Sequence, residues 1–138
     1  TRNGAMAAEA LGFFNPDDAT LAGFHRKRGG HLWSKHRYLA AQFDAYLEND
    51  LWLELATTSN ANMTRLRDGI SLSRSASILA GGDGNELFIA MDEDIAEGLL
   101  ERGHMFYAWP SLPKAYRLVT SFTTTTAEID EFIKDLNS

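Results

Sequence analysis

The sequence predicts an α+β fold, in which long helices accompany a small antiparallel sheet that carries helices on one face. Two long segments between residues 32 and 70 repeat apolar residues at three- and four-residue spacing, as amphipathic helices do. The second half of the chain then follows the order strand, strand, helix, strand, strand, helix. A glycine-rich stretch, residues 81–85, is the strongest turn signal and separates the first two strand-like runs.

The first 30 residues predict a strand and a short helix. The run AMAAEALGFF, residues 5–14, is apolar and ends at Asn15-Pro16, so we expect a buried strand. Asp17 and Asp18 precede a short helix that reaches about residue 28, and two glycines then break the chain.

Two helices are expected next, over residues 32–49 and 51–70, with Asn49 or Asp50 between them as a cap. Their apolar stripes contain Leu32, Leu39, Phe43, Tyr46 and Leu47 in the first, and Trp52, Ala56, Ser59, Met63, Leu66 and Ile70 in the second. Such a pair commonly connects two lobes. We therefore divide the chain into residues 1–30, 31–70 and 71–138.

The C-terminal part contains the sheet. Strands are expected at residues 75–80, 86–91, 104–109 and 115–122, where proline ends the third. Asp92 begins a helix that Gly103 ends, and Thr125 and Glu128 have the spacing of a capping box at the start of the last helix.

Composition excludes several classes of protein. The 138 residues carry a net charge of −6, which argues against general nucleic-acid binding. No apolar run approaches the ~20 residues of a membrane span. The chain has no cysteine, which fits a cytoplasmic protein. It begins at Thr1 without an initiator methionine, so we expect a piece of something longer.

The stretch HRKRGGHLWSKHR, residues 25–37, holds five of the thirteen Lys and Arg residues and three of the four His. Cations beside a helix start can bind phosphate, whereas the plain alternative is a solvated basic face. A metal site at His25, His31 and His36 is disfavoured by their spacing, and we expect no metal. Binding of RNA, with Trp33 and Tyr38 stacking on bases, conflicts with the acidic composition.

Arg117 is the second candidate, because it stands among Tyr116, Leu118 and Val119 on a predicted strand. A guanidinium that leaves an apolar strand suits a carboxylate ligand. The alternative, an edge-strand arginine with its tip in water, is about equally compatible with the sequence.

The segments TRNGAMAAEALGFF, RKRGGHLWSKHRYLAAQ and YRLVTSF, in this order, resemble the C-terminal portion of pyridoxal-phosphate-dependent L-threonine aldolases. The similarity is to the low-specificity and phenylserine-aldolase-like branch of the β-eliminating lyase family. The resemblance implies a fold-type-I enzyme, with residues 1–30 as the end of the cofactor-binding large domain, 31–70 as connecting helices and 71–138 as the small C-terminal domain.

The resemblance also implies roles for four residues. Arg2 stands where the family's T-K-N-G motif has the lysine that attaches the cofactor. Lys35 and Arg37 match the basic region that reaches the cofactor phosphate of a neighbouring subunit. Arg117 matches the arginine that binds the carboxylate of the amino-acid substrate.

The implied activity is cleavage of β-hydroxy-α-amino acids to glycine and an aldehyde, in a cytoplasmic homo-oligomer that binds neither nucleic acid nor membrane. Arginine stays protonated and cannot replace the lysine chemically. The chain also lacks the large domain, so we expect it to be inactive alone. The alternative is a non-catalytic dimerisation or interaction module of aldolase ancestry.

Overall fold

The structure is a computed structural model that describes residues 3–138, which form two compact units. The first unit runs to Trp52, and the second spans Leu53–Ser138. The three-part division expected from the sequence remains a prediction.

The first unit is mostly helical. It contains α1 (Pro16–Ala19), α2 (Ala22–Arg28), α3 (Arg37–Leu47) and a short 3-10 helix, η1 (Glu48–Asp50). Asn49 and Asp50 have φ angles of 52° and 59°. This left-handed backbone suits Asn and Asp, which were expected between the two long helices. It ends the run of α3 before α4 (Leu51–Ser71) begins.

The prediction of a buried strand at residues 5–14 is wrong. The segment has no regular secondary structure and belongs to no sheet, and Met6 and Leu11 are 85% and 86% exposed. A strand requires a neighbour to pair its backbone groups, and no strand is present in the described part of this unit. The amide N–H groups of Met6 and Ala7 instead donate to Gln42 Oε1 on α3, at 2.9 and 3.0 Å.

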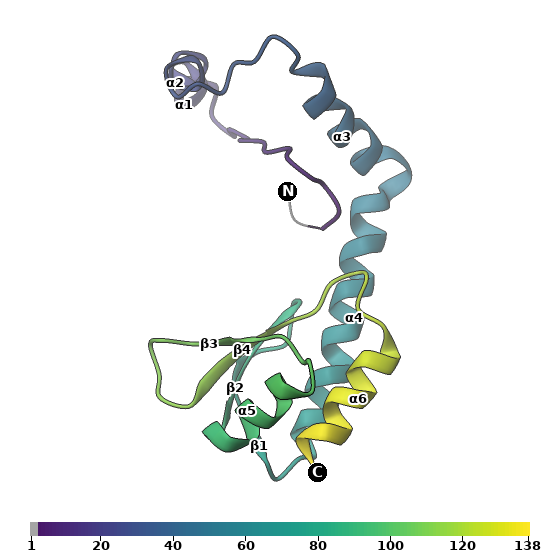
Figure 1. Ribbon diagram of the computed structural model, residues 1–138. Helices are drawn as coiled ribbons and strands as arrows, with labels where there is room; N and C mark the ends of the chain where they lie inside the picture. The colour runs from purple at the N-terminus through teal and green to yellow at the C-terminus, as the bar shows by residue number, and fades with distance from the viewer. Residues whose placement is uncertain (1–2) are drawn as a thin grey trace. The chain divides into compact units, whose positions relative to one another are not determined.

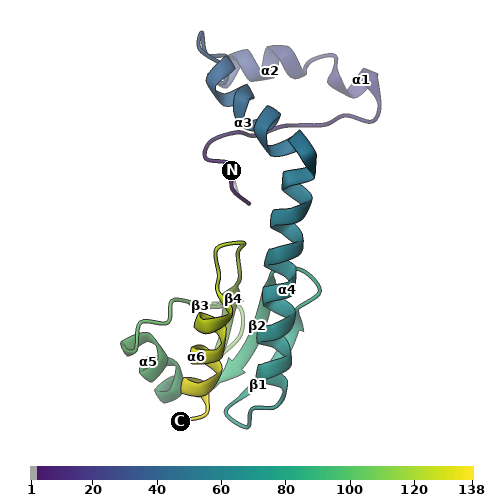
Figure 2. The same ribbon diagram turned by 90° about the vertical axis from the view of Figure 1, so that its right-hand side faces the viewer.

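The second unit is a four-stranded antiparallel sheet in the order β1-β2-β4-β3. The strands are β1 (Ala76–Gly81), β2 (Glu86–Met91), β3 (Tyr107–Ala108) and β4 (Ala115–Val119). Figure 1 and Figure 2 show the end of α4, with α5 (Glu93–Glu101) and α6 (Thr126–Leu136), beside this sheet. The predicted third strand is much shorter than expected.

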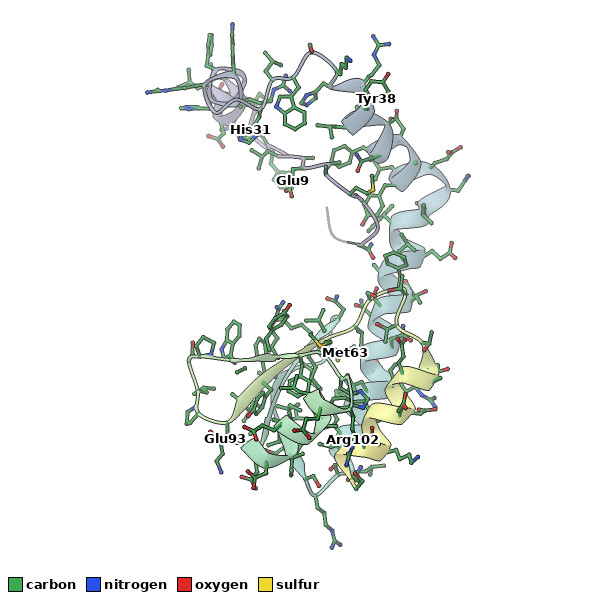
Figure 3. All side chains as sticks on the ribbon, in the orientation of Figure 1. Glu9, His31, Tyr38, Met63, Glu93 and Arg102 are labelled. Atoms are coloured by element: carbon green, nitrogen blue, oxygen red, sulfur yellow. The ribbon has the colours of Figure 1, made fainter. Side chains whose placement is uncertain are left out.

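One face of the sheet forms the core with the three helices. Leu87 and Ile89 of β2 are fully buried, and they alternate with Glu86, Phe88 and Ala90, which face the other side. Figure 3 shows Met63, from the predicted apolar face of α4, among the side chains of this unit. The core consists of Met63, Leu66, Ile70, Leu87, Ile89, Met91, Ala96, Leu99, Phe106, Tyr116, Leu118, Ile129, Phe132 and Leu136. The predicted α+β fold with helices on one face of the sheet is therefore confirmed.

The capping signals at the start of α6 and after the end of α5 are also confirmed, whereas the expected cap by Asp92 is not formed. Thr125 Oγ1 accepts from the backbone N–H of Glu128, and the Glu128 carboxylate accepts from the N–H of Thr125, which completes the capping box of α6. Gly103, just after α5, has φ of 95°. Asp92 is the N-cap residue of α5, but its side chain accepts from Lys114 Nζ at 2.6 Å instead of capping the helix.

Within residues 3–138, no helix has the length and apolar character needed to cross a membrane.

Candidate functional site

Arg117 lies on the face of the sheet that is opposite the helices. It is the middle residue of β4, and its neighbours Tyr116 and Leu118 point into the core. The side chain of Arg117 is 25% exposed, so it is half-buried and not a solvated edge residue. Because β4 is paired on both sides, by β2 and β3, Arg117 stands on an inner strand of the sheet.

Aromatic residues surround Arg117 on this face. The register pairs Arg117 with Phe88 on β2 and with Tyr107 on β3. Residues directly opposite in an antiparallel pair project on the same side of the sheet. Trp109 packs edge-on against Phe88, with ring centroids 4.9 Å apart. Arg117 therefore shares this face of the sheet with two aromatic neighbours, of which Phe88 is half-buried and Tyr107 is 72% exposed.

The guanidinium of Arg117 has a partner that the sequence reading missed. Its Nε donates to Oε2 of Glu86 at 2.7 Å, and its Nη2 contacts the same oxygen. Glu86 is 39% exposed at the start of β2. The sequence carries no signal for this contact, because it depends on the register of β2 with β4, which places Glu86 diagonally across from Arg117.

The basic stretch lies in the first unit and differs from its predicted geometry. Gly29-Gly30 ends α2 and does not open α3. The N–H of His31 donates to the carbonyl of Arg26 at 3.0 Å, and Gly30 donates to Lys27 at 3.1 Å. Together with φ of 76° at Gly30, this is a Schellman C-cap, which requires a residue with left-handed backbone. The two glycines therefore end a helix, as expected for residues 29–30, whereas the next helix, expected from residue 32, begins only at Arg37.

Lys35 and Arg37 lie at the start of α3, on the other side of this connection. Both side chains are exposed, and neither forms an ion pair with any residue in 3–138. His36, between them, is the N-cap residue but makes no side-chain capping bond. Its Nδ1 atom is buried and has no hydrogen-bond partner in the described chain. Two unpaired cations therefore flank the start of α3, where the N–H groups of Tyr38 and Leu39 already donate to the carbonyls of Lys35 and His36. A pair of cations at this place fits an anion.

The histidines do not gather. Figure 3 marks His31 and Tyr38, on the connection after α2 and at the start of α3. Among residues 3–138, no three His, Cys, Asp or Glu side chains lie close enough together to hold a metal ion. Arg2, the position matched to the cofactor-binding lysine, lies outside the described residues.

A histidine elsewhere forms a close pair. His104, just after α5, places its Nε2 3.0 Å from Asp135 Oδ2 on α6, and both side chains are mostly buried. The hydrogen bond from His104 holds the pKa of Asp135 below its usual value, helped by the charge of Arg102. Because His104 also packs edge-on against Phe132, the pair fastens α6 to the segment before β3.

Two curated proteins match the chain over its whole length. It is 31% identical over 136 residues to the low-specificity L-threonine aldolase of Pseudomonas aeruginosa, and 29% identical over 138 residues to that of a Pseudomonas sp. strain. These matches cover 99% and 100% of this chain. The chain is related to the threonine aldolases. The resemblance inferred from its sequence motifs is thereby confirmed.

The chain spans about 40% of the length of these relatives, 39% of one and 40% of the other. No family model matches it.

Solved structures support the fold. A threonine aldolase of Leishmania major superposes with a TM-score of 0.76 at 24% identity, over 85% of this chain and 34% of that one. The cystine C-S lyase C-DES, solved with its product cysteine persulfide, gives a TM-score of 0.60 at 15% identity, over 72% and 28% of the two chains. A mutant of that lyase has been solved with glycine covalently linked to its cofactor, PLP. The chain has the fold of a segment of a fold-type-I pyridoxal-phosphate enzyme.

Proposed function

We propose that this chain is the C-terminal part of a pyridoxal-phosphate-dependent aldolase that cleaves β-hydroxy-α-amino acids, of the threonine or phenylserine type, to glycine and an aldehyde. The observation that carries the proposal is the similarity to low-specificity L-threonine aldolases over 99% of the chain. The complete enzyme would act on a small amino acid as a cytoplasmic homo-oligomer.

Arg117 binds the carboxylate of the substrate in this proposal. A guanidinium offers planar pairs of N–H donors that match the two oxygens of a carboxylate. The half-buried position of Arg117 between Phe88 and Tyr107 supports this role, because a partly desolvated cation attracts an anion more strongly than an exposed one. Holding the carboxylate at a fixed point orients the bond that is to be broken.

Lys35 and Arg37 hold the phosphate group of the cofactor. The two unpaired cations, and the buried Nδ1 of His36 between them that has no partner in the described chain, support this role. When bound, pyridoxal phosphate acts as an electron sink for the charge that develops on the amino acid. The chain offers no lysine at position 2 to attach the cofactor, so this chain alone is inactive in our proposal.

A hybrid enzyme tests the function. In the hybrid, this chain replaces the matched 136 residues of the Pseudomonas aeruginosa aldolase, which supplies the rest of the enzyme. We expect no release of glycine from L-threonine or phenylserine with Arg2, and cleavage once Arg2→Lys restores a nucleophilic amine. Cofactor absorbance and circular dichroism of both hybrids serve as the folding control. A folded, cofactor-loaded Arg2→Lys hybrid that cleaves neither substrate would refute the proposal.

The same hybrid tests the phosphate contacts. Lys35→Ala and Arg37→Ala should each weaken retention of the cofactor by about 1–3 kcal/mol, the scale of a lost charge-assisted hydrogen bond. Arg26→Ala, which removes a cation from α2, is the matched control. Equal retention in all three variants would support a solvated basic face.

Arg2 favours a second candidate, a non-catalytic dimerisation or interaction module of aldolase ancestry. In that case the Arg2→Lys hybrid still binds no cofactor covalently, as borohydride reduction and mass spectrometry would reveal, while the chain itself forms a stable complex with a full-length partner.

A further inference from the structure

We propose that Glu86 is a positioning residue for Arg117. It binds one edge of the guanidinium and so fixes the plane in which the remaining N–H donors meet the carboxylate of the substrate. This inference rests on the proposed role of Arg117 and adds a second residue to that site.

The contact uses only part of the guanidinium. Both Nε and Nη2 of Arg117 contact the single oxygen Oε2 of Glu86, the first of them at 2.7 Å. No group within residues 3–138 accepts a hydrogen bond from Nη1. The two N–H groups of Nη1 and the outer N–H of Nη2 remain. One N–H of Nη1 and the remaining N–H of Nη2 lie parallel at the end of the guanidinium, where they can take a carboxylate end-on.

The backbone fixes Glu86 in this place. The register pairs Glu86 with Val119, two residues beyond Arg117 on β4, so Glu86 and Arg117 are diagonal neighbours on one face. At the residue before Glu86, the carbonyl of Asn85 accepts a hydrogen bond of 3.0 Å from the backbone N–H of Thr120, which holds the start of β2 against the end of β4. The carboxylate therefore approaches Arg117 from a direction that the sheet determines.

Such a partner has a physical benefit for ligand binding. A free arginine side chain has a large rotamer entropy, which a ligand has to overcome when it immobilises the side chain. Glu86 removes part of that freedom before the ligand arrives, as preorganised sites do.

Glu86 also has an opposite effect, because its negative charge offsets part of the attraction of Arg117 for an anion. Two substitutions separate these effects. Glu86→Gln removes the charge but keeps an oxygen that can accept from Nε, whereas Glu86→Ala removes both. Positioning predicts that the Gln variant binds a carboxylate at least as tightly as the wild type, and that the Ala variant binds more weakly.

The experiment uses the 138-residue chain labelled with ¹⁵N at arginine, followed by nuclear magnetic resonance. Without ligand, the Nε–H signal of Arg117, assigned from its loss in Arg117→Ala, should exchange slowly with solvent in the wild type and in Glu86→Gln, and rapidly in Glu86→Ala. L-threonine is then titrated into each protein. We expect the dissociation constant to be about tenfold larger for Glu86→Ala than for Glu86→Gln, the scale of a modest misplacement of a binding group. The Nη signals of the wild type should move while Nε–H keeps its protection.

Asp130→Ala is the matched control. The carboxylate of Asp130 on α6 accepts two hydrogen bonds, of 2.9 and 2.8 Å, from the guanidinium of Arg65 on α4, in an exposed place. The substitution Asp130→Ala therefore removes a similar ion pair elsewhere in the same unit. Binding of L-threonine should not change. If Glu86→Ala binds as tightly as Glu86→Gln, or if the ligand displaces Nε–H from Glu86, the positioning role is wrong although Arg117 still binds carboxylates. If no arginine signal of any variant responds to L-threonine, the proposed role of Arg117 fails, and the role of Glu86 fails with it.

Discussion

Arg117 is the residue on which the proposed chemistry depends most. In the sequence, Arg117 is notable as an arginine among apolar neighbours. The sequence is compatible both with a carboxylate-binding arginine and with an edge-strand arginine whose tip lies in water. The structure resolves the local question, because Arg117 is half-buried on an inner strand and holds an ion pair with Glu86. Such a guanidinium has lost much of its hydration, and an anion that reaches it gains more than it would at an exposed tip.

We therefore expect Arg117→Ala in the Arg2→Lys hybrid to lower kcat/KM for L-threonine. The loss should correspond to about 2–4 kcal/mol of transition-state stabilisation, the scale of a broken, partly buried charge pair. Arg117→Lys should recover only part of the loss, because an ammonium cannot reproduce the planar fork. Steady-state kinetics measure both variants, and the cofactor absorbance should stay unchanged as a control. If kcat/KM is unchanged in Arg117→Ala, Arg117 does not bind the substrate and has only a structural role in the sheet.

At the scale of the element, α6 is fastened at both ends. The capping box at Thr125 satisfies its first N–H groups, and Asp135 bonds to His104 near its end. Between them, α6 packs so closely on α4 that a Cβ added at Gly69 would stand 2.2 Å from Cδ1 and 2.8 Å from Cγ1 of Ile133. The glycine in α4 therefore allows the close approach of the two helices.

The pairing of Asp135 makes the stability of the second unit depend on pH. The pKa of Asp135 is lower in the folded protein than in the unfolded chain, so the folded state binds fewer protons at this site. Its stabilising effect is complete above the unfolded pKa of about 4 and is lost as the pH falls through the lowered folded value. Asp135→Asn should be less stable than the wild type at pH 7, and the difference should shrink towards pH 2. Urea unfolding at several pH values measures it, and a difference that stays constant with pH would contradict the assignment.

The contact at Gly69 predicts a coupled effect. Gly69→Ala gains about 1 kcal/mol of helix propensity, but overpacking against Ile133 costs about 1–3 kcal/mol, so we expect a net loss of stability. In an Ile133→Ala background the clash is absent, and Gly69→Ala should become stabilising. Thermal unfolding of the four proteins gives the coupling energy. If Gly69→Ala has the same effect on stability in both backgrounds, the contact between Gly69 and Ile133 does not set how closely α4 and α6 pack.

At the scale of the whole molecule, the two units differ in how well they bury their apolar residues. The second unit has a core that joins three helices to the sheet. Within the described part of the first unit, the one buried apolar residue is Ala8, whereas Phe14 and Phe24 are 109% and 73% exposed. Leu39 and Phe43 of α3 are half-buried, and Trp52 is 41% exposed. Large exposed apolar surfaces drive association.

We expect the chain to form dimers or larger assemblies, or to be poorly soluble, when it is alone. A shortened chain that begins at residue 53 should instead be a monomer, because its core is complete without the first unit. Analytical ultracentrifugation over a range of concentrations compares the two. A stable monomer of the whole chain at high concentration would favour a self-sufficient interaction module over a segment of a larger enzyme.

The sequence by itself determined the elements whose signals are local. The 3.6-residue period of Met63, Leu66 and Ile70 predicted the buried face of α4, and the alternation of residues 86–91 predicted β2 with its limits. The capping box at Thr125 fixed the start of α6. These features depend on neighbours a few residues away, so the order of residues is sufficient to specify them.

Only the tertiary structure decided features that depend on distant neighbours. Residues 5–14 have the composition of a strand, but a strand forms only where another strand pairs with it, and here Gln42 takes two of the free N–H groups. The helix expected from residue 32 begins only at Arg37, after a connection that follows Gly30. The register of β2 with β4 brings Glu86 to Arg117, 31 residues away along the chain. Contacts of this kind arise when elements pack together, and no local pattern of residues contains them.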